Sequence, residues 1–296
     1  MQLVIKIMNY LFFYLAAILL LGMPRLAGAA PIAELYLFPR ERLSTNTLDA
    51  YQEVITNSAW EKFDKVGVYG ALPNNPPYFK IFMQTVQHLA QLHGRDLAYQ
   101  APTIGAEGWE QYSWSRSDFW EQYGPKIPST FWGLDIESLR LKPTVPSADR
   151  ALKIRTFLDR FIRAANASKV QKDVWFTGSW DHFQPSGKAA PLIFTPDLVA
   201  QLDRVHWMDL PKLLSTYGDE AAYRKQIKML LEITGPQKTY LQVGFLNDMD
   251  MAGNATRARR MMAIAQQMGI NRFTIYVKLS EMHDPKFKEF YDELQK

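Results

Sequence analysis

The chain has 296 residues, of which 47% are hydrophobic and 22% are charged, and this composition is typical of a globular protein and excludes a largely disordered chain. Its formal net charge of +4 is small, and its lysines and arginines are scattered, so we expect no nucleic-acid partner. Cysteine is absent, so no disulfide can stabilise the fold and the hydrophobic core must do so.

The N-terminus has the pattern of a secretory signal peptide. Lys6 follows the free amine, Leu11–Gly22 is an almost continuous apolar run, and Ala27–Ala30 offers small residues suited to cleavage by signal peptidase. The apolar run is shorter than the roughly 20 residues of a membrane span, and an uncleaved inner-membrane anchor is the alternative. We therefore expect residues 1–30 to be a leader and residues 31–296 to form one domain that is periplasmic or secreted.

The body of the chain alternates short apolar segments with helical patterns. The short segments have the length of strands and are rich in β-branched and aromatic residues. In chain order, we predict strands at residues 33–38, 65–71, 96–102, 130–137, 173–178, 204–209, 239–245 and 272–278. We predict helices at residues 47–58, 78–92, 115–122 and 148–165, a short helix opening at Thr195–Pro196, and helices at 221–233, 255–268 and 285–294. Gly94 and Gly269 are expected to end the helices that precede them.

This alternation predicts parallel strands joined by helical crossovers. Eight repeats favour a closed (β/α)8 TIM barrel, a fold that needs roughly 250 residues. The alternative is an open, doubly wound sheet, but the first predicted strand lacks the glycine-rich phosphate loop of nucleotide-binding sheets. We therefore predict a single α/β barrel domain that uses no cofactor.

The fourth predicted strand carries the strongest candidate site, because active sites of this fold lie at the C-terminal ends of the strands. Side chains alternate along a strand, so the apolar residues at 132, 134 and 136 would face the helices, and Asp135 and Glu137 would face the barrel interior with Phe131. Two acids in a sheltered lumen cannot both ionise freely, and one would keep a proton near neutral pH, as a general acid must. The alternative is a structural pair satisfied by Lys, Arg or water.

A fourth strand that ends in Asp-x-Glu resembles that of the chitinase-like glycoside hydrolases of family 18 and of the lysozyme-like family 25. The resemblance implies that Glu137 protonates the leaving oxygen. It also implies that Asp135 orients and stabilises the 2-acetamido group of the substrate as this group attacks the anomeric carbon. Family 18 has a Tyr-Asp pair at the end of strand six, where this chain keeps Asp209 but displaces the aromatic residue. Thr130 and Gly133 stand where family 18 has two further aspartates.

Polar and aromatic residues at other strand ends complete the predicted site. Sugar rings present C–H faces that pack on indole, although such tryptophans can instead cover the rim of the barrel. We expect no metal, because the five histidines are dispersed along the chain. The candidate substrate-binding residues are Gln100, Trp180, Asp181, Trp207, Asn247 and Asp248.

Together these patterns predict an exported glycosidase that acts on a polysaccharide or peptidoglycan-like substrate containing N-acetylhexosamine. One alternative is a glycan-binding barrel that has lost turnover, which the missing upstream aspartates favour. Another is an envelope scaffold whose barrel end binds a protein. Contact with a membrane is expected only through the leader, if the leader is not cleaved.

Overall fold

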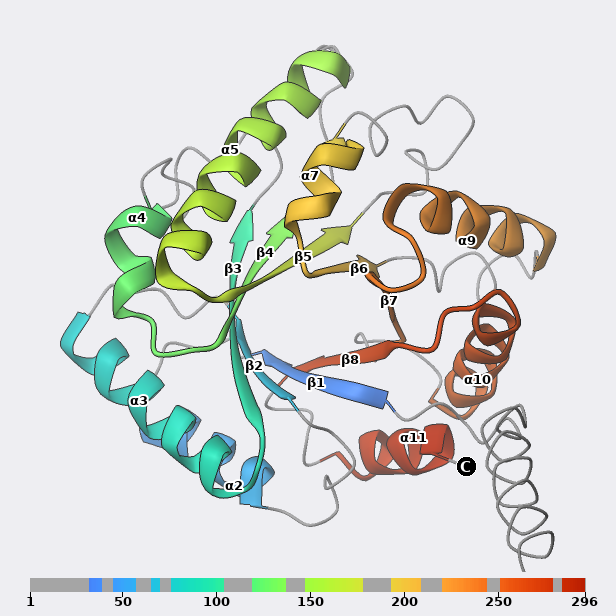
Figure 1. Cartoon of the computed structure of the whole chain (residues 1–296). Coiled ribbons are helices and arrows are strands. Elements are labelled where there is room, and N and C mark those ends of the chain that lie inside the picture. The colour runs from blue at the N-terminus through green and yellow to red at the C-terminus, as the bar shows by residue number, and fades with distance from the viewer. Residues whose placement is uncertain are drawn as a thin grey trace, which may run out of the picture.

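The computed structural model describes residues 32–38, 45–56, 65–69, 76–103, 119–136, 147–177, 193–208, 220–243, 251–278 and 284–295. Its strands form a closed parallel barrel in chain order, with helices outside the ring (Figure 1). The strands are β1 (Ile32–Phe38), β2 (Lys65–Tyr69), β3 (Asp96–Thr103), β4 (Phe131–Ile136), β5 (Gln171–Thr177), β6 (Arg204–Met208), β7 (Thr239–Gln242) and β8 (Phe273–Lys278). β8 pairs in parallel with β1 and closes the ring, so the predicted (β/α)8 architecture is confirmed and the open sheet is wrong.

The helices of the described segments lie between successive strands in the chain or, in the case of the last one, after the final strand, as the alternating pattern predicts. They are α2 (Thr45–Thr56), α3 (Pro76–Leu92), α4 (Phe119–Tyr123), α5 (Ser147–Ser168), α7 (Pro196–Gln201), α9 (Glu220–Thr234), α10 (Met251–Gln267) and α11 (Pro285–Gln295), with a short 3-10 turn, η4 (Gly124–Lys126), after α4. Their ends differ from the predicted ends by up to four residues, because apolar spacing defines the middle of a helix better than its termini. No helix in the described segments is both long enough and apolar enough to span a membrane.

Two helix ends use glycine in the left-handed conformation, as predicted. Gly94 (φ 66°) follows α3 and Gly269 (φ 95°) follows α10. After each glycine the next backbone N–H bonds back to the helix, from Arg95 to the carbonyl of Ala90 at 2.8 Å and from Ile270 to that of Ala265 at 3.0 Å. These bonds satisfy carbonyl groups at the helix ends and turn the chain into the next strand.

The outward faces of the strands form the main hydrophobic core together with the helices. Trp132, Leu134 and Ile136 of β4 are all buried there, which confirms that these three residues face the helices. Trp132 stacks on Trp120 of α4 with ring centroids 5.2 Å apart. This core lies between the barrel and its helical layer, so the opposite face of each strand is left to line the barrel interior.

The inward faces carry a different set of residues. Ala98, Phe131 and Trp175 form a second, small hydrophobic cluster that is separate from the main core. The strands also carry buried polar side chains, and these include Lys65, Asp173, His206, Gln242 and Thr274. The inside of the barrel is therefore filled partly by ionisable groups.

Candidate functional site

The structure places Asp135 near the C-terminal end of β4, where it is the fifth of six strand residues. It is paired in register with Pro102 of β3 and Trp175 of β5. Phe131, which is in phase with Asp135 along β4, belongs to the interior cluster, as the alternation predicts. Gln100 lies on the neighbouring β3 and is paired with Gly133. Position 135 is therefore on the strand face and at the strand end that the prediction requires.

Several predicted site residues lie outside the described segments. Glu137 follows the last residue of β4, and Asp209 follows the last residue of β6. The remaining residues outside the described segments are Trp180, Asp181, Asn247 and Asp248. Their assignments stay predictions. The described segments show the part of the barrel on the N-terminal side of these positions.

Trp207 lies on the wrong side of its strand for the predicted role in substrate binding. Its side chain is 0% exposed and packs against Phe176 and Phe194, with ring centroids 5.4 and 5.3 Å away. Its indole N–H donates to Thr234 Oγ1 of α9 at 3.4 Å. The prediction placed this residue by its nearness to the strand end, but the alternation of side chains turns it toward the helices, away from the lumen.

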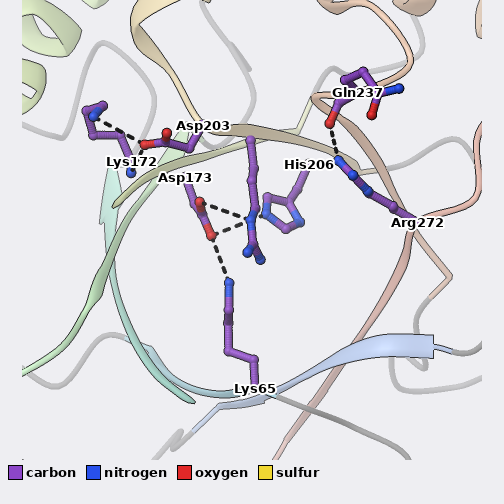
Figure 2. Close-up of polar contacts among 8 residues, drawn as sticks. Lys65, Lys172, Asp173, Asp203, His206, Gln237 and Arg272 are labelled. Carbon is purple, nitrogen blue, oxygen red and sulfur yellow. Dashed lines mark hydrogen bonds and ion pairs between the residues drawn. The ribbon is translucent and has the colours of Figure 1, made fainter. Parts of the chain in front are cut away.

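An ion cluster fills the barrel interior toward the N-terminal ends of the strands. Asp173 of β5 is its centre, and Lys65 Nζ lies 3.4 Å from Asp173 Oδ2. Arg204 Nε lies 3.9 Å from Asp173 Oδ1, and His206 Nε2 lies 3.6 Å from Oδ2. In Figure 2 the side chains of Lys65, Asp173 and His206 point toward one another inside the ring of strands. One carboxylate thus meets two cations and one imidazole that come from β2 and β6.

Burial sets the charge states in this cluster. It lowers the pKa of the His206 imidazole to about 4, and the nearby Asp173 carboxylate offsets this effect only in part. Burial alone would raise the pKa of Asp173, but the charge of Lys65 and the imidazole of His206 outweigh it and hold the pKa below its usual value. At neutral pH the cluster therefore contains an ionised aspartate and a neutral histidine.

Two arginine side chains lie against aromatic rings near the N-terminal ends of the strands. The guanidinium carbon of Arg204 lies 4.7 Å from the ring centroid of Phe131 and 5.3 Å from that of Tyr240, and the guanidinium carbon of Arg272 lies 5.4 Å from Tyr240. Arg272 also donates to the backbone carbonyl of Gln237 (Figure 2). These cation–π contacts lie at the end of the barrel that TIM-barrel enzymes use for stability and not for chemistry.

Sequence reasoning missed this interior cluster. Lys65, Asp173 and His206 lie within predicted strands but are not among the predicted site residues, although an ionisable residue within an apolar strand is a signal in itself, since its burial needs a partner. No group of three metal-binding side chains occurs within the described segments. The cluster lies next to Phe131, whose ring centroid is 3.5 Å from Lys65 Nζ, and so lies on the N-terminal side of Asp135.

The comparisons with known proteins agree with this fold. No protein-family model matches the sequence, and neither does any curated protein. Among solved structures, the glycoside hydrolase domain of PgaB (BpsB) from Bordetella bronchiseptica is 10% identical, with a TM-score of 0.58 over 89% of this chain and 99% of that chain. A class V chitinase from Pseudomonas fluorescens is 8% identical, with a TM-score of 0.57 over 89% of this chain and 100% of that chain. At such low identity these likenesses show a shared fold and no more.

The same barrel also occurs in a protein described as a lectin. The tamarind chitinase-like lectin is 10% identical to this chain, with a TM-score of 0.51 over 88% of this chain and 98% of that chain. The chain therefore has a TIM-barrel fold that glycoside hydrolases share with a sugar-binding protein. A protein with this fold can cleave a sugar or only bind it. Which of the two it does depends on the residues at the C-terminal ends of its strands.

Proposed function

We propose that this protein is an exported glycoside hydrolase that cleaves a polysaccharide containing N-acetylhexosamine. The observation that carries the proposal is the place of Asp135, which is the penultimate residue of β4 in a closed parallel barrel. Glu137 follows the last residue of the same strand. Both acids therefore belong to the strand end where enzymes of this fold carry out their chemistry.

In the proposed mechanism Glu137 is the general acid that protonates the leaving glycosidic oxygen. Asp135 orients the 2-acetamido group of the substrate, whose carbonyl oxygen attacks the anomeric carbon as the glycosidic bond breaks. Asp209 is the further carboxylate that we assign to this site, where it assists in holding the acetamido group. A polar group held by a carboxylate in a low-dielectric site stabilises the developing positive charge more strongly than it would in water.

The ion cluster supports a chemical role for the acid pair over a structural one. Lys65 and Arg204, two cations of the barrel interior, lie against Asp173 on the N-terminal side of position 135. A buried cation is stabilised by a close carboxylate, and Asp173 supplies that carboxylate here. Because Lys65 and Arg204 already lie beside Asp173, they are less suited to neutralise acids at positions 135 and 137. This favours a role for those two acids in acting on a ligand at the open end of the barrel.

The proposed location outside the cytoplasm rests on the first 30 residues, which have the charge, apolar run and small residues of a leader. It fits a substrate in the envelope or the surroundings of the cell. N-terminal sequencing of the protein recovered from the periplasm and the medium tests it. Recovery of an intact N-terminus from the membrane fraction would support the anchor in its place.

The test of activity uses purified protein with chitin oligomers, peptidoglycan and poly-N-acetylglucosamine, and measures new reducing ends. We expect Glu137→Gln to abolish product formation and Asp135→Asn to lower it at least about 100-fold, since each change removes a group that acts in the transition state. Asp203→Asn is the matched control. Asp203 lies just before β6, at the other end of the barrel, and binds the backbone N–H of Lys172. Equal turnover by the wild type and Glu137→Gln would remove the assignment.

A glycan-binding protein without turnover is the second candidate. It is favoured by Thr130 and Gly133, which stand where family 18 has aspartates. It predicts saturable binding of chitin oligomers in calorimetry and no reducing ends after prolonged incubation. Release of product by the wild type but not by Glu137→Gln would exclude it.

A further inference from the structure

The N-terminal end of the barrel gathers basic residues that are scattered along the sequence. We count here the first three residues of each strand and the described turn or connection that leads into it. Within these positions the basic residues are Lys65, Arg95, Lys126, Lys169, Lys172, Arg204, Lys238 and Arg272, and the acidic residues are Glu34, Asp96, Asp173 and Asp203. Eight basic residues against four acidic ones leave a net charge of +4 at this end. Residues 57–64, which lead into β2, lie outside the described segments, and their sequence adds a net charge of −1.

Four of these cations have no carboxylate partner in the described segments: Lys126, Lys169, Lys238 and Arg272. Lys126 and Lys169 are exposed, and Lys238 and Arg272 are partly exposed. Lys238 and Arg272 donate to backbone carbonyls, which carry only partial negative charge. The positive charge of all four side chains is therefore left to act on a partner outside the barrel.

The acids that lie closest to this end already have basic partners. Asp203 Oδ2 lies 3.2 Å from Lys172 Nζ, and Asp173 lies between Lys65 and Arg204 in the ion cluster. Burial lowers the pKa of the Arg204 guanidinium, and the nearby charge of Arg272 adds to this effect. The cations thus repel one another in part, and a negative partner at this end would relieve the repulsion.

The direction of the chain points this end toward the leader. β1 begins at Ile32, and strands of a parallel barrel all begin at the same end. Residues 23–31 separate Ile32 from the apolar run of the leader, and fully extended they span at most about 32 Å. A leader that stays in a membrane would therefore hold the N-terminal end of the barrel near the lipid surface. The C-terminal strand ends, with position 135, lie at the opposite end.

We propose that the N-terminal end of the barrel binds the anionic headgroups of a membrane surface. The four unpaired cations lead into β4, β5, β7 and β8, so their charge is spread around the ring of strands. Such a spread fits a flat array of phosphate groups better than it fits one compact anion. The contact is made by charge alone and needs no inserted leader. It leaves the C-terminal end of the barrel open on the side away from the lipid.

Sedimentation of the purified protein with lipid vesicles tests the binding. One set of vesicles contains equal parts of phosphatidylglycerol and phosphatidylcholine, and the other contains phosphatidylcholine alone. The test variant is Lys126→Gln/Lys169→Gln, since both side chains are exposed. Lys225→Gln/Lys228→Gln is the matched control, because it removes the same charge from two exposed positions on α9, at the side of the barrel.

We expect the wild type to bind the anionic vesicles and not the neutral ones. Raising the salt from about 0.05 M to about 0.5 M should release it, because the added ions screen the attraction. The test variant should bind about 10- to 30-fold more weakly, since each basic residue near an anionic surface contributes about a 5-fold factor. The control variant should stay within about 2-fold of the wild type.

A fluorescent label on an introduced thiol tests the orientation, which is simple in a chain without cysteine. Gln237→Cys places the label in the connection into β7, and Ala221→Cys places it in the first turn of α9, which follows β6 and so begins toward the C-terminal strand ends. Both positions are exposed. We expect a lipid with a spin label on its headgroup to quench the label at position 237 and to leave the label at position 221 unquenched.

Equal binding to both kinds of vesicle would show attachment without charge and overturns the proposal. An equal loss in the two lysine variants, or stronger quenching at position 221, overturns it as well. If no vesicle is bound but heparin retains the protein through Lys126 and Lys169, the partner is an anionic polysaccharide and the membrane assignment fails. None of these results bears on the proposed function, which the measurement of reducing ends decides.

Discussion

Lys65 and Asp173 form a buried ion pair that joins β2 to β5, two strands that are not neighbours in the sheet. Lys65 Nζ lies 3.4 Å from Asp173 Oδ2, and both side chains are 2% exposed. The pair therefore ties together parts of the barrel wall that backbone hydrogen bonds do not connect. Its energetic importance is expected to show when Asp173 is lost, since the buried charge of Lys65 then loses its carboxylate.

We expect Asp173→Asn to lower the free energy of unfolding by about 3–5 kcal/mol, because it leaves Lys65 without its carboxylate. Lys65→Met should cost less, since Arg204 and His206 still face Asp173. The double variant should cost less than the sum of the two single changes. Urea unfolding followed by circular dichroism measures all three, and strict additivity would show that the pair contributes no interaction energy.

Stability should fall as the pH is lowered from about 6.5 to about 4. The pKa of His206 is about 4 in the folded protein and ordinary, near 6.5, in the unfolded chain, so within this window the unfolded chain binds more protons. The loss should reach at most about 3 kcal/mol. Asp173 does not contribute within this window, because its pKa is lowered from a value already below 4.

Thermal unfolding at a series of pH values checks this expectation. His206→Phe keeps a ring stacked on Trp175 and should reduce the dependence on pH between 6.5 and 4. His88→Gln, at an exposed position on α3, is the control and should leave the dependence as it is in the wild type. A slope that is the same in all three proteins would refute the assignment to His206.

Gly124→Ala should destabilise the protein by about 1–3 kcal/mol through overpacking. A Cβ at this position would overlap the indole of Trp132, which is itself stacked on Trp120 and cannot move away freely.

Gly94 offers a contrast to Gly124, because no atom lies within 4 Å of its Cβ position and its φ is 66°. There alanine should cost about 1–2 kcal/mol through backbone strain, and asparagine should cost less. Melting temperatures of the three variants separate the two mechanisms.

Trp207→Phe should lower stability by about 1–2 kcal/mol and leave glycan binding unchanged. The change removes buried surface and the hydrogen bond to Thr234, both on the helix side of β6. Parallel measurements of urea unfolding and of chitin-oligomer binding give the two quantities. A loss of affinity for chitin oligomers without a loss of stability would instead support the predicted role of Trp207 in substrate binding.

Much of the architecture could be predicted from the sequence because the signals are local. The apolar run around Val174 and Phe176, for example, lies between helical patterns and has the length of one strand. Glycine at positions 94 and 269 marks helix ends through backbone conformation alone. The candidate acids could be found because Asp135 and Glu137 interrupt an apolar strand near its end. Nearness to a strand end does not predict the side on which Trp207 lies, because the alternation of side chains along β6 turns it into the core between the strands and the helices.

The order of strands, the helices between them and the place of Asp135 on β4 were thus determined by the sequence itself, since propensity and periodicity act over a few residues. Closure of the barrel brought together residues that are far apart in the chain. The contact between Lys65 and Asp173 spans 108 positions, and the stacking of Trp175 on His206 joins two strands. Such contacts depend on the register and curvature of the whole sheet, and no local pattern carries that information. Only the tertiary structure decided which residues fill the barrel on the N-terminal side of the candidate site.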